Sequence, residues 1–513
     1  MTSRILIRPR EYHDSVRLMR ASEAIRQESG VTEAMAMMAT VNNKKILDTS
    51  GLLTDAVKAA NPDDLIIAVV ADTEEAAERA VAAAQSFLSQ KVQSGQQTLQ
   101  PRSVDAACAL NPAINMACIS LPGVYAYREA KRALELGLNV FLFSDNVSRE
   151  DERKLKELAQ EKNRLLMGPD CGTALINGVG LGFANAVRKG KVGLVAASGT
   201  GTQEISSLLD WLHCGVSQAI GTGGRDLQHD IGGLTMLQGL AMLAADHGTD
   251  VIVVTSKPPS PEIAEKIIAF CSRQTKPVVI NFIGQSITGQ KGNITFTSTL
   301  AETALTATRL LNPSCELPHL SSADTNKFMQ TARAARKPSQ RYLRGLYAGG
   351  TLCYEALFLL REQLGGIYSN LEHGTYELKD LFNSKEHTII DMGEDAYTEG
   401  RAHPMIDPSL RNQRILREAQ DPDVALLLLD LVIGYGAHEN PAAQLAETIT
   451  QARAITQADG RDLPVIVTIC GTENDIQNYE KQAEQLWAAG ILVAGNNAEA
   501  VTLAGHYLET LND

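Results

Sequence analysis

The sequence predicts an α/β protein built from several parallel-sheet domains, and two patterns lead to that prediction. Short apolar runs without polar interruptions alternate with amphipathic segments along most of the 513 residues. Such runs are typical of strands that helices cover on both faces of a parallel sheet. Glycine-rich turns directly follow several of the runs, as expected at the edge of such a sheet where ligands bind. A chain of this length holds roughly three or four domains.

Composition and charge argue against several kinds of partner. The net charge is −13 and the sequence contains no basic run, whereas binding to nucleic acid or to an anionic membrane requires clustered positive charge. No apolar run approaches the about 20 residues of a membrane span, and the first residues do not resemble a signal peptide. The eight cysteines show no CxxC pair and no Cys/His spacing typical of zinc. We therefore expect reduced thiols, no metal site and a cytoplasmic protein.

Residues 1–102 are predicted to form a small α/β domain. Thr73, followed by Glu74 and Glu75, marks the start of a helix, because a threonine cap and acidic residues complement the positive end of the helix dipole. The polar, glutamine-rich stretch at 92–103 is predicted to be a linker. The expected elements are strands at residues 5–7, 34–38 and 65–70 and a helix at 73–88.

Two doubly wound domains are predicted to follow, one over residues 103–189 and one over 190–312. Ser148 with the acidic residues after it marks the start of a helix over 148–162. The expected strands lie at residues 116–121, 140–143, 165–167, 192–196, 217–220, 251–255 and 278–282.

A further α/β domain is predicted over residues 341–513. Residues 313–340 show little apolar periodicity and are predicted to connect it to the first half. Glycine-rich strand ends recur in both halves, which indicates two related α/β layers. The expected strands lie at residues 343–347, 388–391, 425–432, 465–470 and 491–494.

The most informative turn is the segment Ser198-Gly199-Thr200-Gly201-Thr202, between a buried strand and a helix. Free N–H groups, the positive end of the helix dipole and the hydroxyls predict a site for a small anion. We assign Ser198, Gly199, Thr200 and Gly201 to this site. No GK[ST] follows, so the turn is not a Walker A loop. A capped helix start without a ligand is the alternative.

A second turn, with Asp170 and Cys171, follows the strand at 165–167 in the segment Met167-Gly168-Pro169-Asp170-Cys171-Gly172-Thr173. Small residues at the carboxyl end of a strand suit a loop that a ligand approaches, so we include Asp170 and Cys171 among the substrate-binding candidates. A purely structural turn explains the spacing equally well. Cys171 as a nucleophile would need an activating base, and none is visible in the sequence nearby.

A third turn contains Gly223, Gly224 and Arg225, after the strand at 217–220. An arginine beside glycines suits a phosphate or carboxylate, because the guanidinium makes bidentate contacts. We therefore assign Gly223 and Gly224 to binding and Arg225 to catalysis. The alternative is a salt bridge within the loop, between Arg225 and Asp226.

In the second half, Gly349 and Gly350 form another glycine turn before a helix and are further anion-binding candidates. His403 is the best candidate for a general acid or base, since it lies near Arg401 and Asp407 in a proline-stiffened segment. Asp407 is included as a binding residue. An ordinary surface histidine is the alternative.

The order of these motifs resembles the α subunit of succinyl-CoA synthetase, and residues 341–513 resemble the CoA-ligase domain that ends its β subunit. A single chain that joins these two parts in this order resembles the FdrA family over essentially its whole length, and four motifs carry that resemblance. The resemblance implies Rossmann-like and flavodoxin-like parallel-sheet domains of the succinyl-CoA synthetase type, after a small N-terminal α/β unit. The motifs are Ser144-Asp145-Asn146-Val147, Gly168-Pro169-Asp170-Cys171-Gly172-Thr173, Gly223-Gly224-Arg225-Asp226-Leu227 and His403-Pro404-Met405-Ile406-Asp407-Pro408.

Three departures separate the chain from an ADP-forming CoA ligase. The loop that carries the phosphohistidine in succinyl-CoA synthetase corresponds to residues 284–293, which contain no histidine. The glycine-rich loop that opens the CoA-binding domain is absent after the strand at 116–121. The ATP-grasp portion is missing, because residues 313–340 lead directly into the C-terminal domain. No cofactor is assigned, and the sequence leaves open whether the chain binds CoA.

The FdrA resemblance implies carbamoyl transfer between oxamate, or a related small amide acid, and phosphate in allantoin catabolism. The implied partners are small anions, including carbamoyl phosphate, together with other subunits and a carbamate kinase. One alternative is an acyl-CoA synthetase that uses a separate ATP-grasp subunit. A second alternative is a non-catalytic regulatory subunit that senses a metabolite.

Overall fold

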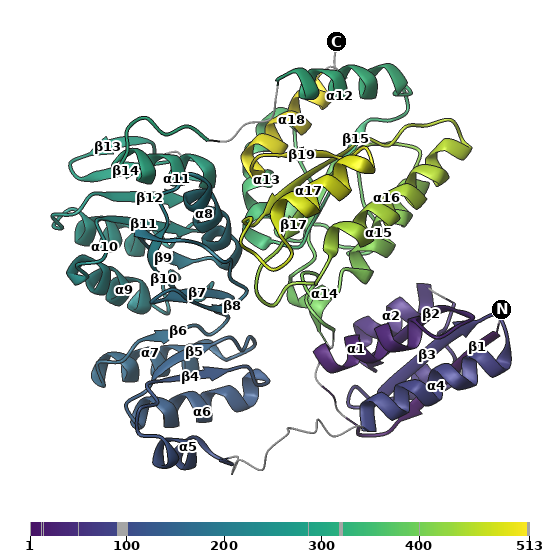
Figure 1. Ribbon diagram of the computed structural model, residues 1–513, viewed down its shortest axis with the longest axis horizontal. Helices are drawn as coiled ribbons and strands as arrows, with labels where there is room; N and C mark the ends of the chain where they lie inside the picture. The colour runs from purple at the N-terminus through teal and green to yellow at the C-terminus, as the bar shows by residue number, and fades with distance from the viewer. Residues whose placement is uncertain are drawn as a thin grey trace. The chain divides into compact units, whose positions relative to one another are not determined.

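A computed structural model of the chain describes residues 2–11, 13, 15–49, 51–89, 101–285, 287–317, 322–399 and 401–509. They form two compact units, Met1–Gln100 with Met392–Arg411, and Pro101–Asp391 with Asn412–Asp513. The described strands form four sheets with helices packed on them, which confirms the predicted α/β class (Figure 1). None of the helices in these ranges is long and apolar enough to cross a membrane.

The first unit contains an antiparallel sheet of order β1-β3-β2, formed by Thr2–Arg8, Leu65–Ala71 and Val31–Met38. The predicted strands and the predicted helix are confirmed, since α4 spans Glu74–Ser89 and the Thr73 hydroxyl accepts the Ala76 N–H at 3.2 Å. Apolar side chains of α4 and of α1 share one core with the sheet. The remaining helices are α1 (Ser15–Arg26), α2 (Val41–Thr49), α3 (Asp55–Ala59) and the short α14 (Asp395–Thr398). Most of the predicted linker at 92–103 lies outside the described residues.

The second unit begins with a parallel sheet of order β4-β5-β6, formed by Met116–Ile119, Asn139–Leu142 and Leu166–Met167. The Ser148 hydroxyl caps α7 by accepting the Asp151 N–H at 3.1 Å, as the sequence predicts. The helices of this part are α5 (Val104–Leu110), α6 (Gly123–Glu135) and α7 (Arg149–Glu161).

The next sheet has the order β13-β14-β12-β11-β9-β10-β7-β8. Its hairpin β7–β8 pairs antiparallel with β10, so this sheet extends across residue 189, where the sequence predicts a domain boundary. Pairing between distant short strands leaves no pattern in the sequence of either strand. The strands are β7 (Thr173–Ile176), β8 (Val179–Gly182), β9 (Lys189–Ala197), β10 (Val216–Gly221), β11 (Val251–Ser256), β12 (Val278–Phe282), β13 (Gly289–Lys291) and β14 (Ile294–Phe296).

The C-terminal sheet is fully parallel and has the order β16-β15-β17-β18-β19. Numbered along the chain, its strands follow the flavodoxin-like order 2-1-3-4-5, as do β10, β9, β11, β12 and β14 of the preceding sheet. The two halves are therefore related, as the recurring glycine turns predict. The strands are β15 (Tyr342–Tyr347), β16 (Thr388–Asp391), β17 (Val424–Val432), β18 (Val465–Cys470) and β19 (Leu492–Ala494).

Helices cover both flavodoxin-like sheets. In the first, α8 and α11 contact each other and α9 contacts α10; in the second, α13 contacts α18 and α16 contacts α17 (Figure 1). The predicted connection at 313–340 contains a helix that the sequence analysis does not predict, α12, whose Met329 and Ala332 are buried. The helices are α8 (Gly199–Trp211), α9 (Leu234–Ala245), α10 (Pro261–Cys271), α11 (Leu300–Arg309), α12 (Ser322–Ala335), α13 (Gly350–Leu364), the 3-10 helix Gly374–Tyr376, α15 (Ser409–Gln420), α16 (Pro441–Ala458), α17 (Tyr479–Ala488) and α18 (Asn497–Glu509).

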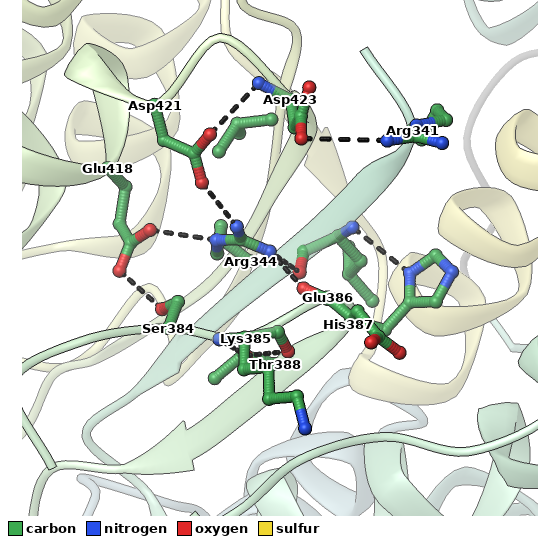
Figure 2. A network of polar contacts seen from close by, with 12 residues as sticks. Arg341, Arg344, Ser384, Lys385, Glu386, His387, Thr388, Glu418, Asp421 and Asp423 are labelled. Atoms are coloured by element: carbon green, nitrogen blue, oxygen red, sulfur yellow. Dashed lines mark hydrogen bonds and ion pairs between the residues drawn. The ribbon is translucent and has the colours of Figure 1, made fainter. Parts of the chain in front are cut away.

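A buried cluster of charges surrounds Arg344 of β15, close to where β16 and β17 begin (Figure 2). Its guanidinium donates to Glu418 at 2.8 Å, to Asp421 at 2.6 Å and to the Glu386 carbonyl. Arg414 and the Ser384 hydroxyl donate to the second oxygen of Glu418. Because every charge has partners and the cluster lies at the amino ends of the strands, it stabilises the fold at the edge opposite to the glycine turns.

A second buried cluster joins α7 to the turn after β10. The ammonium group of Lys156 lies 2.7 Å from Asp226 and 3.1 Å from Glu152, and it donates to the Thr222 carbonyl at 2.9 Å. The three charged side chains are completely buried. Lys156 therefore fixes the shape of the glycine turn at 221–226.

Replacing Lys156 by methionine is expected to destabilise the second unit, because Asp226 then stays buried without its cation. Breaking a buried ion pair in this way costs about 3–5 kcal/mol of unfolding free energy. Lys154 is the matched control, since it pairs with Glu150 at 2.6 Å on the exposed face of the same helix. Its replacement by methionine is expected to cost less than about 1 kcal/mol. Denaturant unfolding measures both variants, and equal losses would contradict this role of Lys156.

Candidate functional site

Three of the predicted turns converge at the carboxyl ends of their strands in the second unit. A Cβ atom at Gly221 would collide with Cys171, and one at Gly223, where φ is +83°, would collide with the Pro169 carbonyl. A Cβ at Gly199 would lie 3.7 Å from the Cα of Gly172. The turns at 168–173, 198–202 and 221–225 are therefore packed against one another, which the sequence alone does not reveal.

The start of α8 has the geometry of an anion site. The Ser198 hydroxyl accepts the Gly201 N–H at 2.9 Å, and the Ser198 carbonyl accepts the Thr202 N–H at 3.3 Å. The first two amides of the helix, those of Gly199 and Thr200, have no acceptor among the residues that the structure describes. Two free N–H groups at the positive end of a helix dipole favour a small anion.

The start of α13 contacts the start of α8. The hydroxyls of Ser198 and Thr351 lie 2.6 Å apart, and the Thr351 N–H donates to the Thr200 hydroxyl at 3.1 Å. Thr351 therefore belongs to the candidate site, although the sequence analysis does not include it. A hydroxyl residue directly after a glycine pair at a helix start is the signal that could have found it.

The two amides directly before α13 are already engaged. Asp430 of β17 is completely buried and accepts the Ala348 N–H at 2.7 Å and the Gly349 N–H at 2.6 Å. A Cβ at Gly350 would collide with the Asp391 carboxylate. Gly349 and Gly350 thus face carboxylates of the protein itself, whereas the amides of Gly199 and Thr200 on α8 have no acceptor among the described residues.

Arg225 does not form the predicted alternative pair with Asp226. Its guanidinium lies 3.0 Å from Glu152 of α7 and donates to the Val147 carbonyl at 2.8 Å, whereas Asp226 pairs with Lys156. Gly224 lies beside Asp170, since a Cβ at Gly224 would be 3.3 Å from the Asp170 carboxylate. These contacts tie the turn after β10 to α7, at residues far away in the sequence.

Cys171 is buried, and its thiol donates to the Thr173 carbonyl at 3.5 Å. Burial raises the pKa of this thiol to about 12, so the thiol stays protonated at neutral pH. This speaks against Cys171 as a nucleophile. Asp170 is exposed and adopts a left-handed backbone conformation, with φ +54°.

His403 and Asp407 lie in the first compact unit, whereas Ser198, Thr200 and Arg225 lie in the second. Burial and the nearby charge of Arg411 lower the pKa of His403 to about 4, and its Nδ1 accepts the Met405 N–H at 3.3 Å. A neutral imidazole with so low a pKa is a weak general base at neutral pH. The Asp407 carboxylate accepts the Ser409 N–H at 3.0 Å.

Two buried glutamates accompany the contact between the helix starts. Asn497 of α18 bridges them, since its backbone N–H donates to Glu204 at 3.1 Å and its side-chain amide donates to Glu355 at 2.7 Å. Burial, and then the charge of Glu355, raises the pKa of Glu204 to about 7, and burial also raises the pKa of Glu355. Glu204 therefore exchanges a proton near neutral pH, close to the free amides of α8.

Replacing Glu204 by glutamine is expected to flatten the pH dependence of stability. The pKa of about 7 in the folded state lies above the value near 4.3 of an unfolded glutamate. The contribution of Glu204 to stability is therefore fully present below about pH 4 and is lost as the pH rises through about 7. E204Q should be more stable than the wild-type chain at pH 8.

Thermal unfolding between about pH 5 and 8 measures this difference. Glu484, which is exposed on α17, supplies the matched control E484Q, and that variant should keep the wild-type slope. An unchanged slope in E204Q would show that this carboxyl group titrates normally.

Three family models match parts of the chain. One described as AllF, heavy metal-associated domain, matches residues 1–103, and one described as CoA-ligase matches residues 346–507. One described as CoA binding domain matches residues 187–284. That match lies almost entirely in the predicted domain 190–312. It leaves out most of the predicted domain 103–189, in which the glycine-rich loop of a CoA-binding domain is absent.

The residues present do not fit a heavy metal in the N-terminal domain. No cysteine precedes Cys108, and the described residues contain no group of three or more His, Cys, Asp or Glu placed to hold a metal ion. At the turn between β4 and α6, a Cβ at Gly123 would collide with the carbonyl oxygens of Asp145 and Asn146, so protein backbone lies directly beside Gly123.

YahF of Escherichia coli is 42% identical over 511 residues, which cover 99% of each chain. The malate–CoA ligase α subunit of Methylorubrum extorquens is 28% identical over 31% of this chain and 55% of its own length. The succinate–CoA ligase α subunit 1 of Archaeoglobus fulgidus is 28% identical over 33% of this chain and 57% of its own length. The chain therefore spans about half the length of each ligase subunit. The match to YahF extends from end to end, and with it the chain belongs to the FdrA family of succinyl-CoA synthetase-like proteins.

Proposed function

We propose that the chain is a subunit of an enzyme that transfers a carbamoyl group between oxamate, or a related small amide acid, and phosphate. The observation that carries the proposal is the start of α8, where the amides of Gly199 and Thr200 are free beside the hydroxyls of Ser198, Thr200 and Thr351. Both reactants are small anions, and such donors favour an anion of this size.

The transfer requires little beyond positioning and charge stabilisation. A phosphate oxygen attacks the carbamoyl carbon of N-carbamoyl-oxamate, the bond from that carbon to the oxamate nitrogen breaks, and this nitrogen takes up a proton. The products are carbamoyl phosphate and oxamate. Amides at the start of α8 would hold the phosphate and offset the negative charge that develops during the attack.

The features that the chain does not share with a CoA ligase support this choice. Residues 284–293 contain no histidine that could carry a phosphoryl group, and carbamoyl transfer needs neither such a carrier nor an ATP-grasp domain. The match of residues 1–103 to the AllF model supports a role in allantoin and purine catabolism.

The proposal includes partners and a location. Two of the relatives are named as α subunits, which supports the expectation that this chain works with further subunits. The proposed location is the cytoplasm. A carbamate kinase would consume the carbamoyl phosphate. Because Arg225 pairs with Glu152, its proposed role is to hold the turn at 221–225 against the site. An anion could contact only the part of the Arg225 side chain that stays exposed to solvent.

Replacing Ser198 by alanine is expected to lower kcat/KM for phosphate roughly ten- to a hundredfold, since a hydrogen bond to a charged group contributes about 1.5–3 kcal/mol. Phosphate-dependent cleavage of N-carbamoyl-oxamate by the chain with its partner subunits is the measurement. S272A, at the exposed end of α10, is the control and should behave as the wild-type protein. No turnover with any small amide acid would exclude the proposed reaction.

The second candidate is an acyl-CoA synthetase that uses a separate ATP-grasp subunit, and the match of residues 346–507 to the CoA-ligase model favours it. It predicts that the chain binds CoA, so calorimetry that shows no affinity at millimolar CoA would remove it. A regulatory subunit is the third candidate. A double variant S198A/R225A with full activity in the reconstituted enzyme would favour that role.

A further inference from the structure

We propose that Arg401 and Asp407 form a second binding site, in the first compact unit, for a small molecule that carries a carboxylate beside an N–H donor. The two residues line a pocket together with Tyr397 and Ser409, all within the segment Met392–Arg411. The site is independent of the proposed reaction, since neither the free amides of α8 nor Thr351 is part of it.

The size of the pocket limits what enters it. It is a shallow hollow of about 270 Å³, and most of that space belongs to its opening to solvent. Its innermost part has room for only about one water molecule. An end group such as a carboxylate can therefore enter, while the rest of the molecule lies in the opening.

Arg401 supplies the positive charge. Its Nη1 atom is buried and has no hydrogen-bond partner in the described part of the chain, and the guanidinium forms no ion pair there. Burial lowers the pKa of Arg401 to about 10, although the charge of Asp407 opposes that shift. An arginine buried without an acceptor is costly for a folded chain, and an anionic ligand would remove that cost.

Three arginines that are more deeply buried than Arg401 differ from it. Arg344 donates to two carboxylates and to backbone carbonyls, as Figure 2 shows. Arg414 donates to Glu418, to the Leu381 carbonyl and to Ser384, and Arg461 donates to Asp459 and to two carbonyls. In these three the fold supplies the acceptors, whereas the buried Nη1 of Arg401 has none among the described residues.

Asp407 decides which kind of anion fits. One of its carboxylate oxygens accepts the Ser409 N–H, and the other has no partner among the described residues. A bare phosphate in this pocket would meet the negative charge of Asp407. A molecule with a carboxylate for Arg401 and an adjacent N–H group for Asp407 satisfies both residues, and amide acids and amino acids have that pattern.

The test is binding to the full chain in the absence of any second substrate, so its result does not depend on catalysis. Oxamate is the probe with both groups, and acetate and phosphate are the probes without the N–H group. We expect oxamate to bind by calorimetry, and R401M to weaken that binding at least tenfold. R401K should weaken it as well, because lysine lacks the planar fork. R20M, at an exposed arginine of α1, is the control.

Two further measurements separate this site from a structural role and from the site at α8. Without ligand, R401M should unfold at the same temperature as the wild-type chain or a higher one, because it removes an unpaired buried charge. S198A should bind oxamate at this site unchanged, and D407N should reduce the preference for oxamate over acetate. A strongly destabilised R401M, or oxamate binding that R401M leaves intact, would overturn the proposal.

Discussion

The hydroxyl contact between the starts of α8 and α13 is the constraint on which the second unit depends. Each helix follows the first strand of a flavodoxin-like sheet, and Ser198, Thr200 and Thr351 join the two helix starts directly. Two positive helix ends this close require negative or accepting groups nearby. Asp430 is such an acceptor directly before α13, whereas the amides of Gly199 and Thr200 on α8 have no acceptor among the described residues.

Two buried carboxyl groups lie near this contact. Glu204 and Glu355 are buried and are linked through Asn497, and the raised pKa of each lets the pair shed charge through protonation. The cations of the unit lie elsewhere, with Lys156 at the turn after β10 and Arg344 at the opposite edge of its sheet. The fold therefore separates the groups that stabilise it from the donors that are free for a ligand.

The relationship to CoA ligases is one of retained architecture and altered chemistry. The chain has CoA-binding and CoA-ligase segments, yet the loop at 284–293 contains no histidine. What both chemistries share is the need to hold small anions at helix starts. Related proteins can therefore retain an anion site at a helix start while the reaction that they catalyse changes.

The sequence by itself determined the α/β class, 15 of the 19 described strands, and the glycine turns at 168–173, 198–202 and 221–225, because these features follow from local hydrophobic runs, caps and backbone freedom. Tertiary structure alone decided which turns meet, that the hairpin β7–β8 joins the larger sheet, and that α12 lies in the connection. It also gave Arg225 and Asp226 their partners on α7, placed His403 in a different unit from Ser198, and left the buried Nη1 of Arg401 without an acceptor among the described residues. Each of these depends on contacts between residues far apart in the chain, and a local pattern carries no information about such contacts.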